Sequence, residues 1–343
     1  MPTSQLGFSA SRVRLGVPRY LVCAVIFVGA FFHPGFQDSA RSWQRQDDVQ
    51  APILPPLKSV VTVPMLREGA PAAPTVSAAA VYIVDEDSSA ILLARGERQL
   101  LYPASLAKLM TALVAYDAYE PATELLVPPD LTVEGTVAGL QPGETLVAQD
   151  LFTALLVSSG NDAAEVFARN YPGGEAAFVA MMNAKAKQLH IRYSAFRTPS
   201  GLDEEGQVVT AQDLAILTRE VVKVPLFRRL VRTPSIEITD VTGKITHVLH
   251  NTNALLEKVP GVVGVKTGTT ELARENLITQ IERDGHTVTV VVLGSHDRYA
   301  DTVALIDWVF ANFRWQEVSA PAYDMTSATA VEQTSVLPTR YGK

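Results

Sequence analysis

The chain has 343 residues, of which 47% are hydrophobic and 19% charged, so it can bury a sizeable core and is not disordered throughout. Its net charge of −7 and pI near 5.4 do not suggest the basic face that nucleic-acid binding requires, so we expect no nucleic-acid partner. The single cysteine, Cys23, excludes a disulfide within the chain and a zinc site built from cysteines.

The first 40 residues have the pattern of an export segment. Three arginines precede an apolar run at 21–32, and the first acidic residue is Asp38. A basic flank followed by an apolar run of this length is typical of a secretory signal, whereas a membrane span needs roughly 20 apolar residues. Residues 1–40 are therefore either a cleaved signal or an N-terminal membrane anchor. The arginines predict that the rest of the chain lies outside the cytoplasmic membrane, in the periplasm or on the membrane's outer face.

Residues 41–76 are interpreted as a proline-rich spacer. Six prolines fall within 51–76 and no amphipathic period is present, and proline at this density favours extended chain. A strand that runs along the following domain is the alternative for this segment. We expect one globular domain over 77–316, followed by a polar C-terminal tail at 317–343.

Within this domain, the hydrophobic pattern predicts strands at both ends and helices between them. Two β-rich runs at 80–85 and 90–94 are separated by a polar tetrapeptide, which is typical of a hairpin. A helix is predicted to open at Ser105, because the apolar residues after it recur at helical spacing. This order favours an α+β fold in which helices flank an antiparallel sheet, with an all-helical subregion. The other expected elements are helices at 151–157, 161–168, 176–189, 211–222 and 302–313, and a hairpin with strands at 276–281 and 287–293.

The first chemical motif is Ser105-Leu106-Ala107-Lys108, at the start of the first helix. Residues three apart on a helix share a face, so the Lys108 amine is expected beside the Ser105 hydroxyl. A serine becomes a nucleophile when an adjacent base takes its proton, and a lysine can be that base once burial or nearby positive charge lowers its pKa. Alone the motif is weak, because the same spacing occurs by chance on many solvated helices.

Two further motifs follow along the chain. Ser159-Gly160-Asn161 lies at a break between helical segments, where both polar side chains can project into a site; an ordinary turn with asparagine as helix cap is the alternative. Lys266-Thr267-Gly268-Thr269 follows a valine-rich run, and Gly268 on a strand lets a ligand approach the backbone closely. A nucleotide-binding P-loop is excluded, because Val265 precedes Lys266 where that motif needs glycine.

Ser-x-x-Lys, Ser-x-Asn and Lys-Thr-Gly in this order match the motif set of penicillin-binding proteins and serine β-lactamases. From about residue 78 to 313 the chain resembles the low-molecular-mass penicillin-binding proteins, specifically the serine-type D-alanyl-D-alanine carboxypeptidases. The resemblance implies a fold like that of β-lactamases and penicillin-binding transpeptidases, and a catalytic domain at 77–316. It extends beyond the motifs to Tyr102-Pro103-Ala104, Asp162-Ala163-Ala164, Pro199-Ser200-Gly201-Leu202 and Thr210-Ala211-Gln212-Asp213-Leu214.

The resemblance also implies a reaction: hydrolysis of the bond between the two terminal D-alanines of a peptidoglycan stem peptide. Ser105 attacks the carbonyl carbon, Lys108 accepts its proton, and water later hydrolyses the acyl-enzyme. β-Lactams, which resemble the D-Ala-D-Ala end, would trap Ser105. The resemblance further implies that Ser159 relays a proton to the leaving nitrogen and that Asn161 supports Lys108 and the substrate amide. It implies that Lys266 and Thr267 bind the carboxylate. The N–H groups of Ser105 and Thr269, beside Gly268, would form the oxyanion hole.

Three other functions are compatible with parts of this pattern. A D,D-endopeptidase that cuts peptidoglycan cross-links uses the same site and is the nearest alternative. A class A β-lactamase needs a deacylating glutamate, and no Glu-x-x-Leu-Asn-like stretch follows Ser159-Gly160-Asn161. An inactive scaffold of the same fold is disfavoured because all three motifs are intact.

We expect neither a cofactor nor a metal ion. His247 and His250 are interpreted as an incidental pair, since no neighbouring cysteine or carboxylate completes a set of ligands. Some members of the family carry an arginine inside an Asn-x-Asn motif, where it makes a second carboxylate contact. Here the stretch is Asn251-Thr252-Asn253, so the sequence does not predict that contact.

Overall fold

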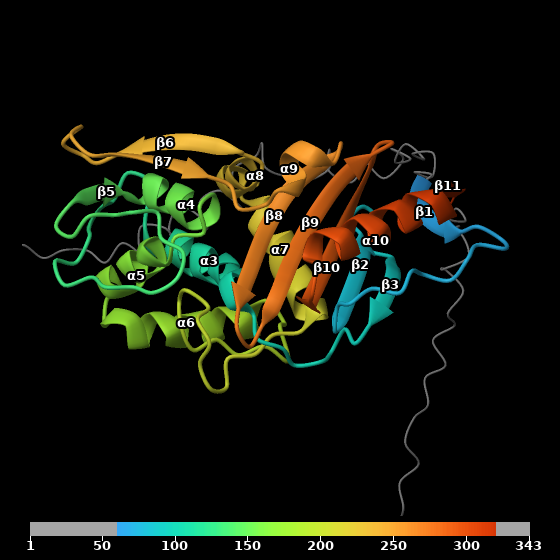
Figure 1. Ribbon diagram of the computed structural model, residues 1–343, viewed down its shortest axis with the longest axis horizontal. Coiled ribbons are helices and arrows are strands. Elements are labelled where there is room, and N and C mark those ends of the chain that lie inside the picture. Colours follow the sequence, from blue (N-terminus) through green and yellow to red (C-terminus); the bar gives the residue numbers. More distant parts are fainter. Residues whose placement is uncertain (1–59, 320–343) are drawn as a thin grey trace, which may run out of the picture. The chain divides into compact units, whose positions relative to one another are not determined.

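The computed structural model describes residues 60–319, and a five-stranded antiparallel sheet runs through it (Figure 1). The strand order is β3-β2-β10-β9-β8, so the β2–β3 hairpin and the β8–β9–β10 meander meet where β2 pairs with β10. The strands are β2 Ala80–Asp85, β3 Ile91–Arg95, β8 Val262–Thr270, β9 Arg274–Arg283 and β10 His286–Ser295.

The sheet is buried on both faces because alternate side chains of its central strands pack into two separate cores. On β2, Val81 and Ile83 belong to one core, whereas Tyr82 and Val84 belong to the other. The helix α10 (Arg298–Asn312) covers the first face, and other helices pack against the second (Figure 1). A strand between two layers needs apolar residues on both sides, which explains the nearly continuous valine run of β10.

The helical subregion is built around α3 (Lys108–Ala118), whose first eight residues are all buried. One turn of 3-10 helix, η1 (Ala104–Ala107), leads into α3 and carries Ser105. An aromatic cluster connects α3 to its neighbouring helices and consists of Tyr116 of α3 together with Phe152, Phe167 and Phe227. The other helices are α4 Ala148–Leu156, α5 Asn161–Asn170, α6 Gly174–Gln188, α7 Ala211–Lys223, α8 Pro225–Val231 and α9 Leu255–Lys258.

These elements confirm the α+β fold, with helices that flank an antiparallel sheet and a helical subregion. All the predicted strands and helices are present, and their bounds differ from the predicted ones by at most four residues. The largest shift is at α10, which begins at Arg298 instead of 302. Its start is fixed by the Asp297 side chain, which accepts the N–H of Ala300 and so caps the first turn.

Two small antiparallel hairpins lie outside the predictions. β4 (Glu124–Leu126) pairs with β5 (Thr145–Val147), and β6 (Ser235–Thr239) pairs with β7 (Thr246–His250). Most side chains of β6 and β7 are exposed, so these strands lack a strong apolar pattern. Their turn is closed instead by Asp240, whose carboxylate accepts hydrogen bonds from the Thr242 hydroxyl and from nearby backbone N–H groups. These hydrogen bonds, the Thr242 hydroxyl first, lower the pKa of Asp240 to about 2.

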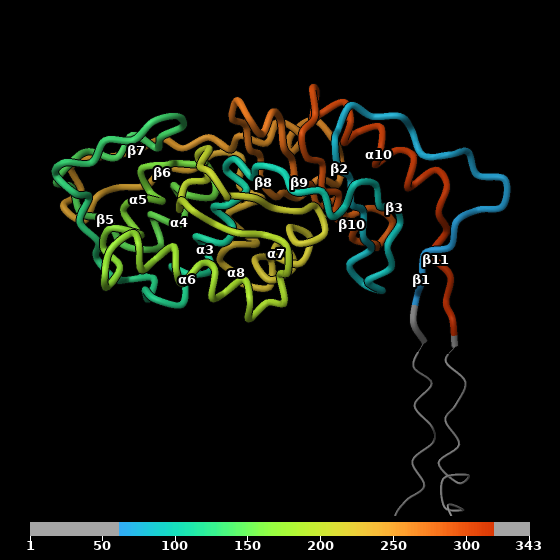
Figure 2. The backbone as a smooth tube through the Cα atoms, turned by 90° about the horizontal axis from the view of Figure 1, so that it is seen from below, coloured from blue at the N-terminus to red at the C-terminus, as the bar shows by residue number. Residues whose placement is uncertain are grey.

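Part of the predicted spacer is a strand. β1 (Val60–Leu66) pairs antiparallel with β11 (Phe313–Ser319), and the two form a ribbon beyond the main sheet (Figure 2). The expected boundary at 316 therefore falls inside β11. Composition could not separate the two readings of this segment, because a proline-rich spacer and a strand are both extended. The strand that pairs with β1 lies about 250 residues away in the chain, so the local sequence does not reveal it.

The remaining predictions at the two ends of the chain lie outside the described residues: the export segment at 1–40, the spacer at 41–59 and the tail at 320–343. Within 60–319, no helix combines the length and the apolar character needed to cross a membrane.

Gly201 allows the segment after α6 to pass against the turn that carries Ser105, and this close approach predicts a large loss of stability for Gly201→Ala. An added Cβ would lie 2.0 Å from the Ala104 carbonyl oxygen, and the φ of Gly201 is +89°. At Gly243, φ is +71° but nothing lies within 4 Å of an added Cβ. Gly243→Ala should therefore cost only the backbone strain, about 1–2 kcal/mol. We expect Gly201→Ala to lower the free energy of unfolding by more than twice as much in urea titrations; equal losses would contradict the close packing.

Candidate active site

Ser105 lies on η1, and its side chain is partly exposed while its neighbours are buried. The turn is fastened to the sheet by Asn276 of β9. The Asn276 amide donates to the carbonyls of Tyr102 (3.0 Å) and Pro103 (3.1 Å), and its side-chain oxygen accepts the N–H of Gly294 at 2.8 Å. Asn276 is itself fully buried. The position of Ser105 is therefore fixed by the sheet as well as by the helix that it opens.

Lys108 follows Ser105 by three residues, and its side chain is fully buried. Its Nζ lies 2.9 Å from Ser105 Oγ, 2.6 Å from Asn161 Oδ1 and 2.7 Å from the Ser200 carbonyl oxygen. Burial lowers the pKa of Lys108 well below its usual value, and the positive charge of Lys266 lowers it further. The environment therefore favours the neutral amine.

A neutral amine at this position has the geometry of a general base. It offers two N–H donors and one lone pair. If the two donors bind the oxygens of Asn161 and Ser200, the lone pair is left to face the Ser105 hydroxyl at 2.9 Å. That distance is within the range over which a positioned base takes a proton.

The second motif lies in the short connection between α4 and α5. Ser159 has a φ of +63°, which is rare for a residue with a side chain, and Asn161 begins α5. The two side chains contact different lysines: Asn161 Oδ1 accepts from Lys108, and Ser159 Oγ accepts from Lys266 Nζ at 2.7 Å. The other half of the Asn161 amide donates to the Glu134 carbonyl at 2.5 Å. This turn therefore links the two buried lysines.

The third motif lies on the edge strand β8, next to the serine turn. A Cβ at Gly268 would lie 3.1 Å from Ser105 N and from the Pro103 carbonyl oxygen, so glycine permits the close approach of β8 to η1. Lys266 is 1% exposed. Burial, followed by the charge of Arg298, lowers the pKa of Lys266 from 10.5 to about 7. Thr267 is buried and its Oγ1 lies 2.6 Å from Thr252 Oγ1.

Arg298 is a residue of the site that the sequence did not indicate. It is the first residue of α10, and its Nη1 donates to the Gly268 carbonyl at 3.0 Å and to the Thr269 hydroxyl. Its Nε is buried without a partner among the described residues. The stretch Asn251-Thr252-Asn253 reaches the site through Thr252, which contacts Thr267. No spacing rule connects Arg298 with Lys266, so only the fold could reveal it.

All eight predicted site residues come together: the serine turn, the α4–α5 connection and β8 contact one another. The two histidines do not form a pair. His247 is buried and His250 exposed on β7, and residues three apart on a strand point to opposite faces. A carboxylate does lie beside His247, but it comes from Glu144, 103 residues earlier. Among residues 60–319, no three His, Cys, Asp or Glu side chains gather as metal ligands.

Solved structures of a DD-transpeptidase and of a D-alanyl-D-alanine carboxypeptidase have the same fold. The Streptomyces K15 DD-transpeptidase superposes with a TM-score of 0.67 at 26% identity, over 70% of this chain and all of that one. A D-alanyl-D-alanine carboxypeptidase from Mycobacterium tuberculosis superposes with a TM-score of 0.68 at 30% identity, over 75% of this chain and all of that one. The fold and the site together thus define a penicillin-binding type of serine peptidase.

The chain belongs to the D-alanyl-D-alanine carboxypeptidase family, peptidase family S11, whose profile matches residues 67–297. It is 30% identical over 240 residues to the carboxypeptidase DacF of Bacillus subtilis. This alignment covers 67% of this chain and 61% of DacF. It is 33% identical to DacB2 of Mycobacterium tuberculosis, over 67% of this chain and 81% of DacB2. A D-alanyl-D-alanine endopeptidase of Pseudomonas aeruginosa is 30% identical, over 73% of this chain and 83% of the endopeptidase.

The buried state of Lys266 predicts a specific dependence of stability on pH. Between its pKa in the folded protein, about 7, and its ordinary value of 10.5, the unfolded chain binds the proton and the folded one does not. The free energy of unfolding should therefore rise with pH in this window, by up to about 1.4 kcal/mol per pH unit for this group. Lys266→Met removes the titrating group. Urea unfolding from pH 7 to 10 should give a shallower rise for the variant, and an unchanged slope would contradict the burial of this charge.

Proposed function

We propose that the protein is a serine D-alanyl-D-alanine carboxypeptidase that removes the terminal D-alanine from peptidoglycan stem pentapeptides. The proposal rests above all on one observation: the buried Nζ of Lys108, with its lowered pKa, lies 2.9 Å from the partly exposed Ser105 hydroxyl. A serine beside such a base is an activated nucleophile. The family to which the chain belongs and the fold that it shares with DD-peptidases support the choice of substrate.

In the proposed acylation step, Ser105 Oγ forms a bond to the carbonyl carbon of the penultimate D-alanine while its proton passes to Lys108. The N–H groups of Ser105 and Thr269 stabilise the negative charge that develops on the carbonyl oxygen. The C–N bond then breaks, and Ser159 passes a proton to the leaving nitrogen. The contact of Ser159 Oγ with Lys266 Nζ at 2.7 Å supports this role, because a proton can be resupplied from the lysine. Water hydrolyses the ester in the second half of the reaction.

Substrate binding is proposed to depend on the cationic end of β8. The free carboxylate of the terminal D-alanine would meet Lys266, Thr267 and Arg298. Arg298 would supply the positive charge that other family members obtain from an arginine in the Asn-x-Asn motif, where this chain has Thr252. An incoming carboxylate also favours the protonated form of Lys266, so binding of substrate would raise the pKa of this lysine. Gly268 would allow the peptide to lie along β8 next to Ser105.

The remaining parts of the proposal concern where the enzyme acts. We propose that it works outside the cytoplasmic membrane, in the compartment that contains peptidoglycan. Residues 1–40 would direct export, either as a cleaved signal or as a membrane anchor, and residues 41–59 would connect them to the catalytic domain. β-Lactams would inhibit the enzyme by acylating Ser105.

A D,D-endopeptidase that cuts cross-links between stem peptides is the second candidate. It is favoured by the presence among the relatives of D-alanyl-D-alanine endopeptidases from Pseudomonas aeruginosa and Escherichia coli, each 30% identical to this chain. Both activities would use the same residues, and they differ in whether the leaving group is D-alanine or a cross-linked peptide.

Covalent labelling by a fluorescent penicillin tests the site directly. We expect the purified protein to be labelled in proportion to time and concentration, and Ser105→Ala to be unlabelled, because the acyl bond needs the Ser105 oxygen. Ser235→Ala, at an exposed serine of β6, is the matched control and should be labelled as the wild type is. Labelling of Ser105→Ala, or none of the wild type, would overturn the proposed function, and so would rapid turnover of nitrocefin.

The same preparation distinguishes the two candidate activities when it is incubated with a monomeric pentapeptide and with a cross-linked dimer. Mass spectrometry should detect free D-alanine from the monomer and no cleavage of the dimer. Cleavage of the dimer in preference to the monomer would identify the protein as an endopeptidase instead.

A further inference from the structure

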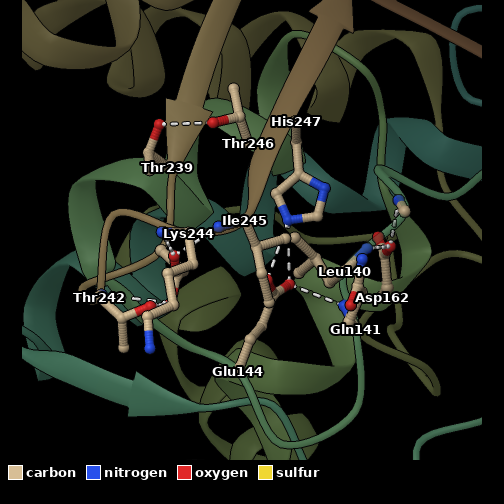
Figure 3. Close-up of polar contacts among 12 residues, drawn as sticks. Leu140, Gln141, Glu144, Asp162, Thr239, Thr242, Lys244, Ile245, Thr246 and His247 are labelled. Carbon is tan, nitrogen blue, oxygen red and sulfur yellow. Dashed lines mark hydrogen bonds and ion pairs between the residues drawn. The ribbon is translucent and has the colours of Figure 1, made fainter.

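A buried acid–base pair lies outside the catalytic motifs, between the loop that precedes β5 and the strand β7 (Figure 3). The ring Nε2 of His247 lies 3.0 and 3.1 Å from the two oxygens of Glu144. The side chain of Glu144 is 0% exposed and that of His247 is 6% exposed. A buried pair of this kind contributes little stability compared with apolar side chains of similar size, so it calls for another explanation.

The pair holds one end of a loop segment, 138–141, whose four consecutive backbone N–H groups are all bound by carboxylates. Asp162 accepts those of Ala138, Gly139 and Leu140 at 2.9–3.0 Å. Glu144 accepts that of Gln141 at 2.7 Å. Figure 3 shows the Glu144 carboxylate directed at both His247 and Gln141. The Glu144–His247 pair thus attaches the loop to the β6–β7 hairpin, while Asp162 attaches it to α5.

The other end of the same loop contacts the second catalytic motif. The backbone N–H of Asn161 donates to the Thr136 carbonyl at 2.8 Å, and its side-chain amide donates to the Glu134 carbonyl. The oxygen of the same side-chain amide, Asn161 Oδ1, contacts Lys108 Nζ. A displacement of the loop would therefore be passed to Lys108 through a single side chain, Asn161.

The hairpin at the other side of the pair leads to the third motif. β7 ends at His250, and two residues later Thr252 contacts Thr267, next to Lys266. The Glu144–His247 pair consequently joins the loop behind Asn161 to the chain that supports β8. Within residues 60–319, neither side chain hydrogen-bonds to Ser105 or Lys108, so an effect on the reaction has to act through these neighbours.

We propose that Glu144 and His247 are positioning residues for the acylation of Ser105, which they serve by holding the 138–141 segment and, through it, the side chain of Asn161. The inference rests on the proposed function and adds two residues to its machinery. Without the pair, the 138–141 segment keeps its hydrogen bonds to Asp162 but loses its attachment to the β6–β7 hairpin. The loop can then shift relative to Asn161, and water gains access to the amine of Lys108. Hydration favours the charged amine, so Lys108 would need a higher pH to act as a base. The charges that act on Lys108 from Lys266, Asp162 and Glu165 stay in place.

Three changes at the pair separate positioning from stability. His247→Phe keeps the ring shape and removes the donor to Glu144. The double change Glu144→Leu with His247→Phe also removes the buried carboxylate, so that its stability should recover toward the wild type. His247→Gln restores an N–H donor. The matched control is Glu86→Leu, which breaks the ion pair with Arg219 at the opposite end of the sheet from Gly268.

The experiment measures the second-order rate constant of penicillin acylation against pH, at temperatures where every variant is folded. We expect the double variant to be slower by about tenfold, the order of loss that a small misplacement of a catalytic group causes. Its acidic limb should move to higher pH. His247→Gln should recover most of the rate, and Glu86→Leu should match the wild type. A folded double variant with wild-type rate and acidic limb would overturn the proposal.

Hydrogen exchange keeps this inference distinct from the proposed function. The amides of residues 138–141 should exchange faster in the double variant than in the wild type, whether or not penicillin labels the protein, and unchanged exchange would overturn the positioning role. If the wild type were not labelled at all, the proposed function would fail on that result alone, and the acylation role of the pair would fail with it.

Discussion

The chemistry of this protein depends on burying the amine of a lysine. Lys108 has no solvent exposure, and the cost of removing an ammonium group from water is what favours its neutral form. The structure does not offset that cost with a carboxylate in direct contact; it supplies the oxygens of Asn161 and Ser200, which are neutral acceptors. A direct ion pair would have stabilised the ammonium and removed the base. Neutral partners orient the amine and leave it basic enough to take a proton from Ser105.

Much of the fold can be understood as what this burial requires. The first turns of α3 are enclosed on all sides, so the helix that carries Lys108 lies between the sheet and the other helices. Gly201 and Gly268 let two backbone segments approach the serine turn more closely than any side chain would permit. Asn276 then fastens this turn to the sheet. Ser105 is left partly exposed at the one place where these elements converge.

The sequence was sufficient where the signal is local and insufficient where it is not. Helical spacing located α3 and brought Lys108 next to Ser105, and the apolar stretches on either side of Asp284-Gly285 located β9 and β10. Arg298, by contrast, reaches β8 only because α10 packs across the sheet, and Glu144 meets His247 only because the β6–β7 hairpin folds over β5. Contacts of this kind join residues 30 to 103 positions apart, and neither propensity nor periodicity encodes them. For the same reason the sequence could not favour the strand β1 over a proline-rich spacer, since the partner of β1 is at the other end of the domain.

The activation of Ser105 depends on the protonation state of Lys108, which can be measured directly by NMR. In protein labelled with ¹³C at the lysine Cε, the signal of Lys108 can be assigned by its loss in Lys108→Ala. Its chemical shift should titrate well below the ordinary range of a lysine, with the amine neutral at pH values where exposed lysines are still charged. A titration near 10.5, like that of an exposed lysine, would contradict the assignment of Lys108 as the base.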